Sequence, residues 1–136
     1  ASGDARFADT HARVGILSGW GLSQKLSRII GINRAREMSL TGNFIDAERA
    51  EAWGLVNRVC AADSLLDEAL ASAAQIADAD PKAVFALKAL MNDGVKQTLG
   101  DALVLEGERG NAFAKTVDYS QMSARLAALR QRAAKQ

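Results

Sequence analysis

The residues best suited to do chemistry lie close together near the start of the chain. His11 is the only histidine among the 136 residues. An imidazole has an unperturbed pKa of about 6.5, so it can accept or donate a proton near neutral pH. A glycine-punctuated loop follows, which contains Gly15, Gly19, Trp20 and Gly21. Because glycine permits positive φ angles and a close approach of backbone to ligand, we predict that residues 7–22 form the wall of a small-molecule pocket.

A strand and a helix have to hold this loop. Residues 5–8 are predicted to be the end of a strand. After the loop, apolar residues recur at the spacing of one helical face, at Leu22, Leu26, Ile29 and Ile30. Gly31 ends this pattern, which predicts a helix over 22–30. The electropositive N-terminus of that helix would lie just beyond Gly19.

The chain then changes from mixed to purely helical character. A second helix is predicted from about residue 33 to Thr41, and Asp46 is a suitable N-cap for a helical turn after it. Residues 55–59 alternate and are rich in β-branched side chains, which predicts a strand, the last in the chain. Asp80-Pro81 places an N-cap before a proline at the first helical position. Helical patterns cover 64–77, 81–91, and the stretches from 98 and from 120.

Composition excludes several classes of protein. The chain is 49% hydrophobic and 24% charged, which is typical of a globular domain. Its net charge of +1 gives no reason to expect nucleic acid or an anionic membrane as a partner. No apolar run reaches the roughly 18 residues of a membrane span. We therefore expect a cytoplasmic protein.

Metal binding is also not expected from the composition. One histidine and one cysteine, Cys60, cannot form a cysteine-rich metal site, and a single cysteine allows no internal disulfide. We expect Cys60 to be a small buried side chain.

Four segments together resemble a known family. They are Phe7-Ala8-Asp9-Thr10-His11-Ala12-Arg13-Val14-Gly15, then Gly19-Trp20-Gly21, then residues 34–42 ending in Leu40-Thr41-Gly42, and Ala52-Trp53-Gly54-Leu55-Val56-Asn57-Arg58-Val59. Their order and spacing resemble the crotonase family, the enoyl-CoA hydratases and isomerases. The helical remainder of the chain fits this family more loosely.

The resemblance implies an α/β fold made of β-β-α turns in a spiral. Residues 1–62 would be the end of the spiral core with the acyl-CoA pocket loop, and residues 63–136 a C-terminal helical oligomerisation region. Such regions build homotrimers, often paired into hexamers. Because family members are considerably longer, we expect this chain to be the C-terminal part. The first catalytic carboxylate and both oxyanion-hole donors would then precede Ala1.

The chemistry that the resemblance implies is the addition of water across the double bond of a 2-enoyl-CoA thioester in fatty acid metabolism. Coenzyme A enters as part of the substrate, and no separate cofactor is expected. By register with the family pattern, His11 occupies the second acid/base position, where hydratases have glutamate. The alternative is a pocket-lining or capping histidine without a catalytic role.

The same register places Gly15, Gly19 and Gly21 on the loop that passes the acyl chain and thioester, although they could also form a plain turn. Trp20 stands where the family often has a small residue. It is expected to narrow the acyl pocket, or else to cover the core.

Basic residues gather at the end of the chain. Residues 121–136 contain four cations and no acid, which is ordinary for a solvated helix face. The resemblance implies that Arg130, Arg132 and Lys135 reach the CoA phosphates or adenine of a neighbouring subunit, although the usual family pattern is replaced here.

The sequence thus favours an enoyl-CoA hydratase or isomerase, and the isolated chain is expected to be inactive. Two alternatives stay open. One is a non-catalytic acyl-CoA-binding homologue in which His11 replaces a needed carboxylate. The other is a helical assembly module formed by residues 64–136.

Overall fold

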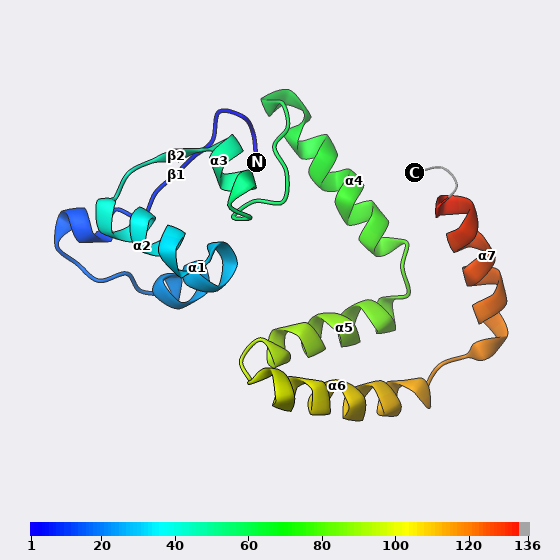
Figure 1. Ribbon diagram of the computed structural model, residues 1–136. Helices are drawn as coiled ribbons and strands as arrows, with labels where there is room; N and C mark the ends of the chain where they lie inside the picture. The colour runs from blue at the N-terminus through cyan, green and yellow to red at the C-terminus, as the bar shows by residue number, and fades with distance from the viewer. Residues whose placement is uncertain (134–136) are drawn as a thin grey trace. The chain divides into compact units, whose positions relative to one another are not determined.

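Two short strands connect the beginning and the middle of the first of two compact units, Ala1–Gln75. In the computed structural model, β1 (Arg6–Phe7) pairs antiparallel with β2 (Ile45–Asp46), and Phe7 lies opposite Ile45 (Figure 1). The structure describes residues 1–133, apart from the side chains of Gln121, Ser123 and Arg132. β1 confirms the predicted end of a strand before the glycine loop.

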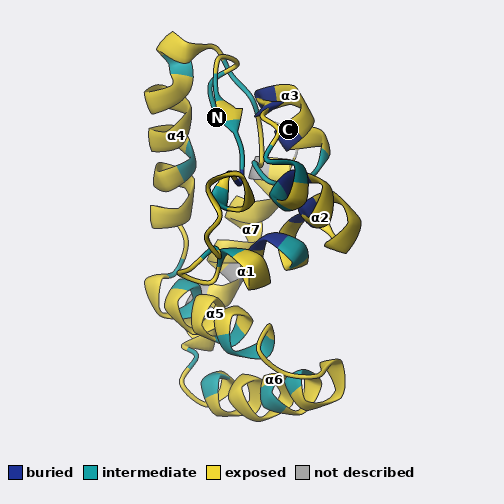
Figure 2. Cartoon of the chain, turned by 90° about the vertical axis from the view of Figure 1, so that its left-hand side faces the viewer, coloured by how far each residue is buried: buried dark blue, intermediate teal, exposed yellow. Residues whose placement is uncertain are grey.

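The two helices that lie between these strands in the sequence supply most of the core. α1 (Leu22–Ile30) has the predicted ends, and α2 (Ile32–Thr41) begins one residue earlier than predicted. Gly31 separates them with a φ of 83°. The buried apolar side chains lie on α1, α2, β2 and α3 (Ala47–Ala52), and Figure 2 shows dark segments on the three helices. The core cluster comprises Leu26, Ile30, Ala35, Met38, Ile45 and Ala50.

α3 begins where the sequence predicted. The Asp46 carboxylate accepts a hydrogen bond from the backbone N–H of Arg49 at 2.8 Å. This satisfies one of the donors that every helix leaves unpaired at its N-terminus. Trp53, at the end of α3, packs partly buried against the core.

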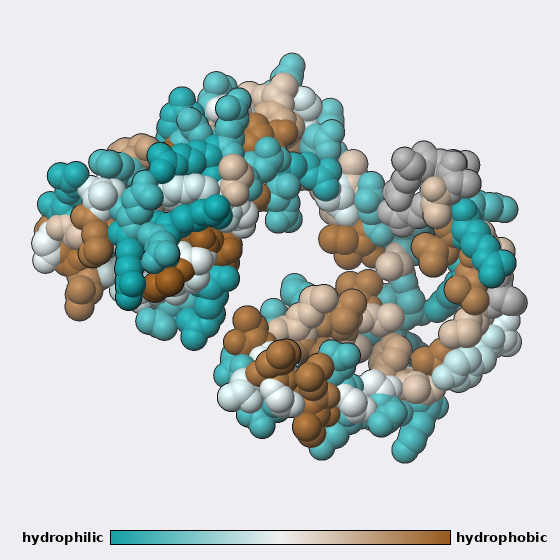
Figure 3. All heavy atoms as spheres, in the orientation of Figure 1, coloured by the Kyte–Doolittle hydropathy of each residue, from teal (hydrophilic) through white to brown (hydrophobic). Residues whose placement is uncertain are grey.

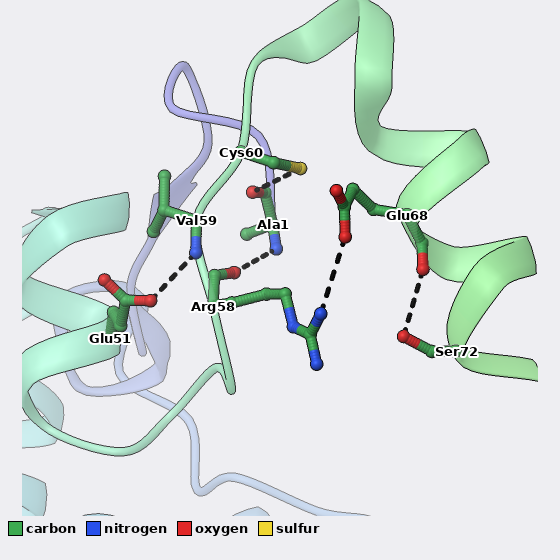
Figure 4. Close-up of polar contacts among 7 residues, drawn as sticks. All are labelled: Ala1, Glu51, Arg58, Val59, Cys60, Glu68 and Ser72. Carbon is green, nitrogen blue, oxygen red and sulfur yellow. Dashed lines mark hydrogen bonds and ion pairs between the residues drawn. The ribbon is translucent and has the colours of Figure 1, made fainter. Parts of the chain in front are cut away.

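The prediction of a strand at residues 55–59 is wrong. The backbone N–H groups of Leu55 and Val56 both donate to the carbonyl of Ala50 and close α3, and Val59 N–H donates to the Glu51 carboxylate at 3.0 Å. These donors are therefore used locally and cannot join a ladder. What remains is one parallel bridge between Ser2 and Cys60. Next to it, the N-terminal amine of Ala1 donates to the carbonyl of Arg58 at 2.8 Å (Figure 4).

The polypeptide then becomes helical, as predicted. A short 3-10 turn at Ala62–Ser64 leads into α4 (Leu65–Ala77). Glu68 on α4 pairs with Arg58 at 3.4 Å and accepts a hydrogen bond at its carbonyl from Ser72 (Figure 4). Cys60 is half-buried, so the expectation of a buried side chain is only partly met. The predicted boundary at residue 62 falls at this 3-10 turn, and it stays a prediction.

The second unit starts at Ile76 and contains α5 (Pro81–Gly94), α6 (Leu99–Ala114), a 3-10 turn at Tyr119–Gln121 and α7 (Met122–Ala133). The predicted caps are present, because Asp80 accepts from Ala83 N–H and Thr98 accepts from Asp101 N–H. α5 runs three residues past its predicted end. Asp93 in its last turn pairs with Lys96 and Arg109, both at 2.9 Å.

Apolar side chains lie exposed along the α5–α6 hairpin. They gather over both helices in Figure 3. A groove of about 500 Å³ runs between α5 and α6, lined by Leu87, Met91, Val95, Leu99 and Leu103 among others. Within the described part of this unit, no residue is buried.

Candidate active site around His11

His11 begins a single 3-10 turn, η1 (His11–Val14), that follows β1. Its Nδ1 lies 2.7 Å from Oδ1 of Asp9, and its backbone N–H donates to the same oxygen at 3.2 Å. The Asp9 side chain is 4% exposed, whereas that of His11 is 27% exposed. A buried carboxylate therefore holds one edge of the imidazole, and the ring itself stays accessible.

The charge on Asp9 is set by two opposing effects. Burial raises the pKa of this carboxyl, but hydrogen bonds from the Ser39 hydroxyl and from His11 outweigh burial, so the pKa lies below its ordinary value. Asp9 is consequently ionised at neutral pH and can only accept hydrogen bonds. The Nε2 atom of His11 makes no hydrogen bond with any residue between 1 and 133 that the structure describes.

The end of α2 anchors the turn that carries His11. Arg13, two residues further on, donates from its guanidinium to the carbonyl of Thr41. Ser39, on the same helix, lowers the pKa of Asp9 through its hydroxyl. The two contacts place His11 against the C-terminal turn of α2, which ends at Gly42 with a φ of 63°.

Two of the three predicted glycines have the conformation that favours glycine. Gly15 ends η1 with a φ of 76°, and Gly21 precedes α1 with a φ of 82°. Gly19 does not have a positive φ, and an added Cβ would meet no described atom within 4 Å. Its backbone therefore does not require glycine. The role of all three in substrate binding stays a prediction.

Trp20 has a backbone that is rare for its side chain. Its φ is 52°, in the left-handed region, and its side chain is 95% exposed. The alternative that Trp20 covers the core is therefore wrong for this unit. Val14, Ile16 and Leu17 are exposed as well, and we call this segment the apolar loop (residues 14–20).

The predicted CoA-binding residues belong to the other unit. Arg130 lies exposed on α7. Lys135 lies outside the described residues, and so does the side chain of Arg132. Arg125, on the same helix, pairs with Asp80 at 2.9 Å. Binding of CoA by these cations stays a prediction.

Two further properties of the described chain bear on function. Across residues 1–133, no group of three or more histidine, cysteine, aspartate or glutamate side chains lies close enough to hold a metal ion. Nor does any described helix have the length and apolar character needed to cross a membrane.

His11 was predicted from the sequence as the candidate catalytic residue, whereas roles for Asp9 and Ser39 were not predicted. Asp9 could have been found, since an aspartate two residues before a helical turn commonly caps it through its own side chain. Ser39 gave no local signal, because it reaches Asp9 only through the packing of α2.

Comparison with known proteins decides the family. The profile of the family described as "Enoyl-CoA hydratase/isomerase" matches residues 1–123. The chain belongs to this family. A protein of Arabidopsis thaliana named "Probable enoyl-CoA hydratase 1, peroxisomal" is 49% identical over 113 residues, which cover 83% of this chain and 43% of that protein. The "Delta(3,5)-Delta(2,4)-dienoyl-CoA isomerase, mitochondrial" of Dictyostelium discoideum is 36% identical over 121 residues, covering 88% of this chain and 41% of that protein.

Solved structures agree with this assignment. The enoyl-CoA hydratase from Bacillus anthracis superposes with a TM-score of 0.85 at 30% identity, over 96% of this chain and 50% of that one. The enoyl-CoA hydratase/isomerase family member described here therefore has part of a crotonase fold, as predicted. It spans about half the length of the curated relatives it matches.

Proposed function

We propose that this chain supplies one wall of the active site of an enzyme that hydrates or isomerises enoyl-CoA thioesters in fatty acid metabolism. The observation that carries the proposal is the Asp9–His11 pair, which presents an accessible imidazole beside the apolar loop. An acyl-CoA offers an apolar chain next to a reactive thioester. The apolar loop suits the acyl chain, and reaction next to the thioester needs an acid/base group.

The proposed role of His11 follows from the chemistry of hydration. The oxygen of water adds to C3 of the enoyl group and one of its hydrogens arrives at C2, so one proton leaves water and one is delivered to carbon. A neutral imidazole accepts such a proton at Nε2, and the resulting imidazolium returns one. Stabilisation of the thioester enolate needs backbone N–H donors, which we expect to lie outside this chain.

An acyl-CoA titration tests binding on the chain as it is. Tryptophan emission is recorded while crotonyl-CoA or a longer 2-enoyl-CoA is added. Because Trp20 is 95% exposed, its coverage by an acyl chain should shift the emission to the blue. Free CoA provides the matched control without an acyl group, and Trp20→Phe should abolish the shift. An equal response to free CoA, or none to any thioester, would contradict the proposal.

Catalysis is tested by assaying hydration of crotonyl-CoA and isomerisation of a 3-enoyl-CoA. The chain alone should show neither, whereas a protein of the full family length that contains this chain should show one of them. His11→Gln should then lower kcat by about 10²-fold or more.

The non-catalytic acyl-CoA-binding homologue is the second candidate, and the identity of residue 11 favours it, because the family resemblance places a glutamate there. His11→Glu separates the two in a protein of the full family length that contains this chain. A large gain in hydration rate would support the non-catalytic binder, and a loss would support a working histidine.

Assembly and location complete the proposal. The exposed apolar groove between α5 and α6 supports self-association, because exposed patches of this kind mark interaction surfaces. The family resemblance favours a homotrimer or a dimer of trimers. Light scattering on the chain tests this, and a strictly monomeric folded species would remove the assembly role. We also propose a cytoplasmic location and no separate cofactor.

A further inference from the structure

We infer that Asp9 is a positioning residue for His11: its buried carboxylate holds the imidazole with the proton on Nδ1 and leaves Nε2 as the atom that exchanges protons with the substrate. The inference rests on the proposed function for the role of Nε2. Its geometric part, the hold of Asp9 on the ring, stands on the contacts of this chain alone.

One carboxylate oxygen fixes His11 at two points. Oδ1 of Asp9 accepts from the backbone N–H at 3.2 Å and lies 2.7 Å from Nδ1 of the ring. The backbone contact fixes the base of the residue, and the ring contact fixes the direction of the imidazole. Asp9 is itself held, because its side chain is 4% exposed within the first unit. The ring orientation is therefore set from the interior of the first unit.

The same contact decides which nitrogen has the proton. An ionised carboxylate has no hydrogen to donate, so a separation of 2.7 Å requires the hydrogen to lie on Nδ1. In neutral His11 the lone pair then lies on Nε2, which makes no hydrogen bond with a described residue. When Nε2 takes up a proton, the new positive charge is shared by a ring that already contacts a carboxylate. A carboxylate accepting from Nδ1 serves a histidine base in this way in other enzymes.

A purely structural role for Asp9 is the competing explanation. Asp9 could serve only to cap the entry to η1 by an Asx-turn, in which its carboxylate accepts from the backbone N–H of His11. Asparagine forms this turn as aspartate does, so Asp9→Asn keeps that function. It removes the charge, and its amide can donate to Nδ1 instead of accepting from it. A cap alone thus predicts a silent variant, whereas positioning predicts a changed tautomer.

Nitrogen-15 NMR of the imidazole distinguishes these outcomes without substrate. Because His11 is the only histidine, selective labelling gives one ring with no assignment step. In the wild-type chain, at a pH where the ring is neutral, we expect its one N–H proton on Nδ1. In Asp9→Asn we expect the Nε2–H form to gain in a chain that still folds. A wild-type ring protonated mainly on Nε2, or an unchanged pattern in a folded Asp9→Asn variant, would overturn the inference.

Steady-state kinetics provide the second readout, in a protein that contains this chain and hydrates or isomerises enoyl-CoA. Asp9→Asn should lower kcat on the order of 10²-fold and leave KM within about threefold, since the substrate contacts are kept. Ser39→Ala should have a smaller effect in the same direction. If the NMR result is as expected and acyl-CoA is not bound, the proposed function fails while the hold of Asp9 on His11 stands. If Asp9→Asn raised KM by as large a factor as it lowered kcat, the positioning role would be contradicted.

Discussion

Gly42 and Arg13 pack so closely that no side chain fits between them. A Cβ built on Gly42 would lie 2.5 Å from Cγ of Arg13, and the φ of Gly42 is 63°. Arg13 belongs to the turn that begins with His11, and its guanidinium donates to Thr41, the residue before Gly42. The end of α2 therefore helps to set the position of the candidate catalytic turn.

Gly42→Ala tests this relationship. We expect the free energy of unfolding to fall by at least about 1–2 kcal/mol, because alanine is strained at a left-handed φ and would also displace Arg13. Gly107→Ala is the matched control, since Gly107 lies within α6 with no described atom near its Cβ. That change should raise the free energy of unfolding by about 0.5–1 kcal/mol. Urea denaturation followed by circular dichroism measures both. If the free energy of unfolding changed in the same direction in both variants, the close packing of Gly42 against Arg13 would be contradicted.

Two leucines test how small the core is. Leu26 is 4% exposed in the core of the first unit, whereas Leu17, in the apolar loop, is 95% exposed. Leu26→Ala should cost about 2–5 kcal/mol because it leaves a cavity. Leu17→Ala should change the free energy of unfolding by less than about 0.5 kcal/mol. A comparable loss for both would mean that the apolar loop is packed in solution, against this structure.

Arg49 makes two surface contacts that add to the stability of α3. Its guanidinium carbon lies 4.5 Å from the centroid of the Trp53 ring, and it pairs with Glu37 at 2.7 Å. Arg49→Ala should lower the free energy of unfolding by about 1 kcal/mol. Arg36→Ala, on the exposed face of α2, should change it by less than about 0.5 kcal/mol. Chemical denaturation in low and high salt checks this, because added salt should reduce only the part due to the ion pair.

Asp9 gives the first unit a defined dependence on pH. Its pKa in the folded chain is lowered from the ordinary 3.8, so its contribution to stability is complete above that pH and is lost as the pH falls through the lower folded value. The stability difference between the wild-type chain and Asp9→Asn should therefore be constant above about pH 5 and shrink toward pH 3. Denaturation at a series of pH values measures it. A difference that grows on acidification would mean that the carboxyl pKa is raised instead.

Local signals in the sequence were enough for most helices. The periodicity of α1, closed by Gly31, and the caps Asp46 and Asp80 depend only on neighbouring residues. The family assignment likewise rested on segments that are contiguous in the chain. These features need no knowledge of tertiary packing, which is why they could be predicted.

Contacts between distant segments could not be predicted in the same way. Residues 55–59 have strand propensity, but a strand also needs free donors, and those of Leu55 and Val56 are used to close α3. The Asp9–Ser39 contact joins positions thirty residues apart and arises only when α2 packs beside the turn of His11. For the candidate site, the sequence therefore indicated the imidazole, and the structure added the groups that orient it.

The left-handed backbone of Trp20 has an implication for directed evolution. A large side chain at a φ of 52° lowers stability, and this indole, which is 95% exposed, gains little from packing within the described chain. A library randomised at position 20 and screened only for heat resistance should enrich glycine. A library screened for retention on an acyl-CoA resin should enrich tryptophan. If the two screens enrich these different residues, tryptophan at position 20 favours ligand binding and lowers the stability of the fold.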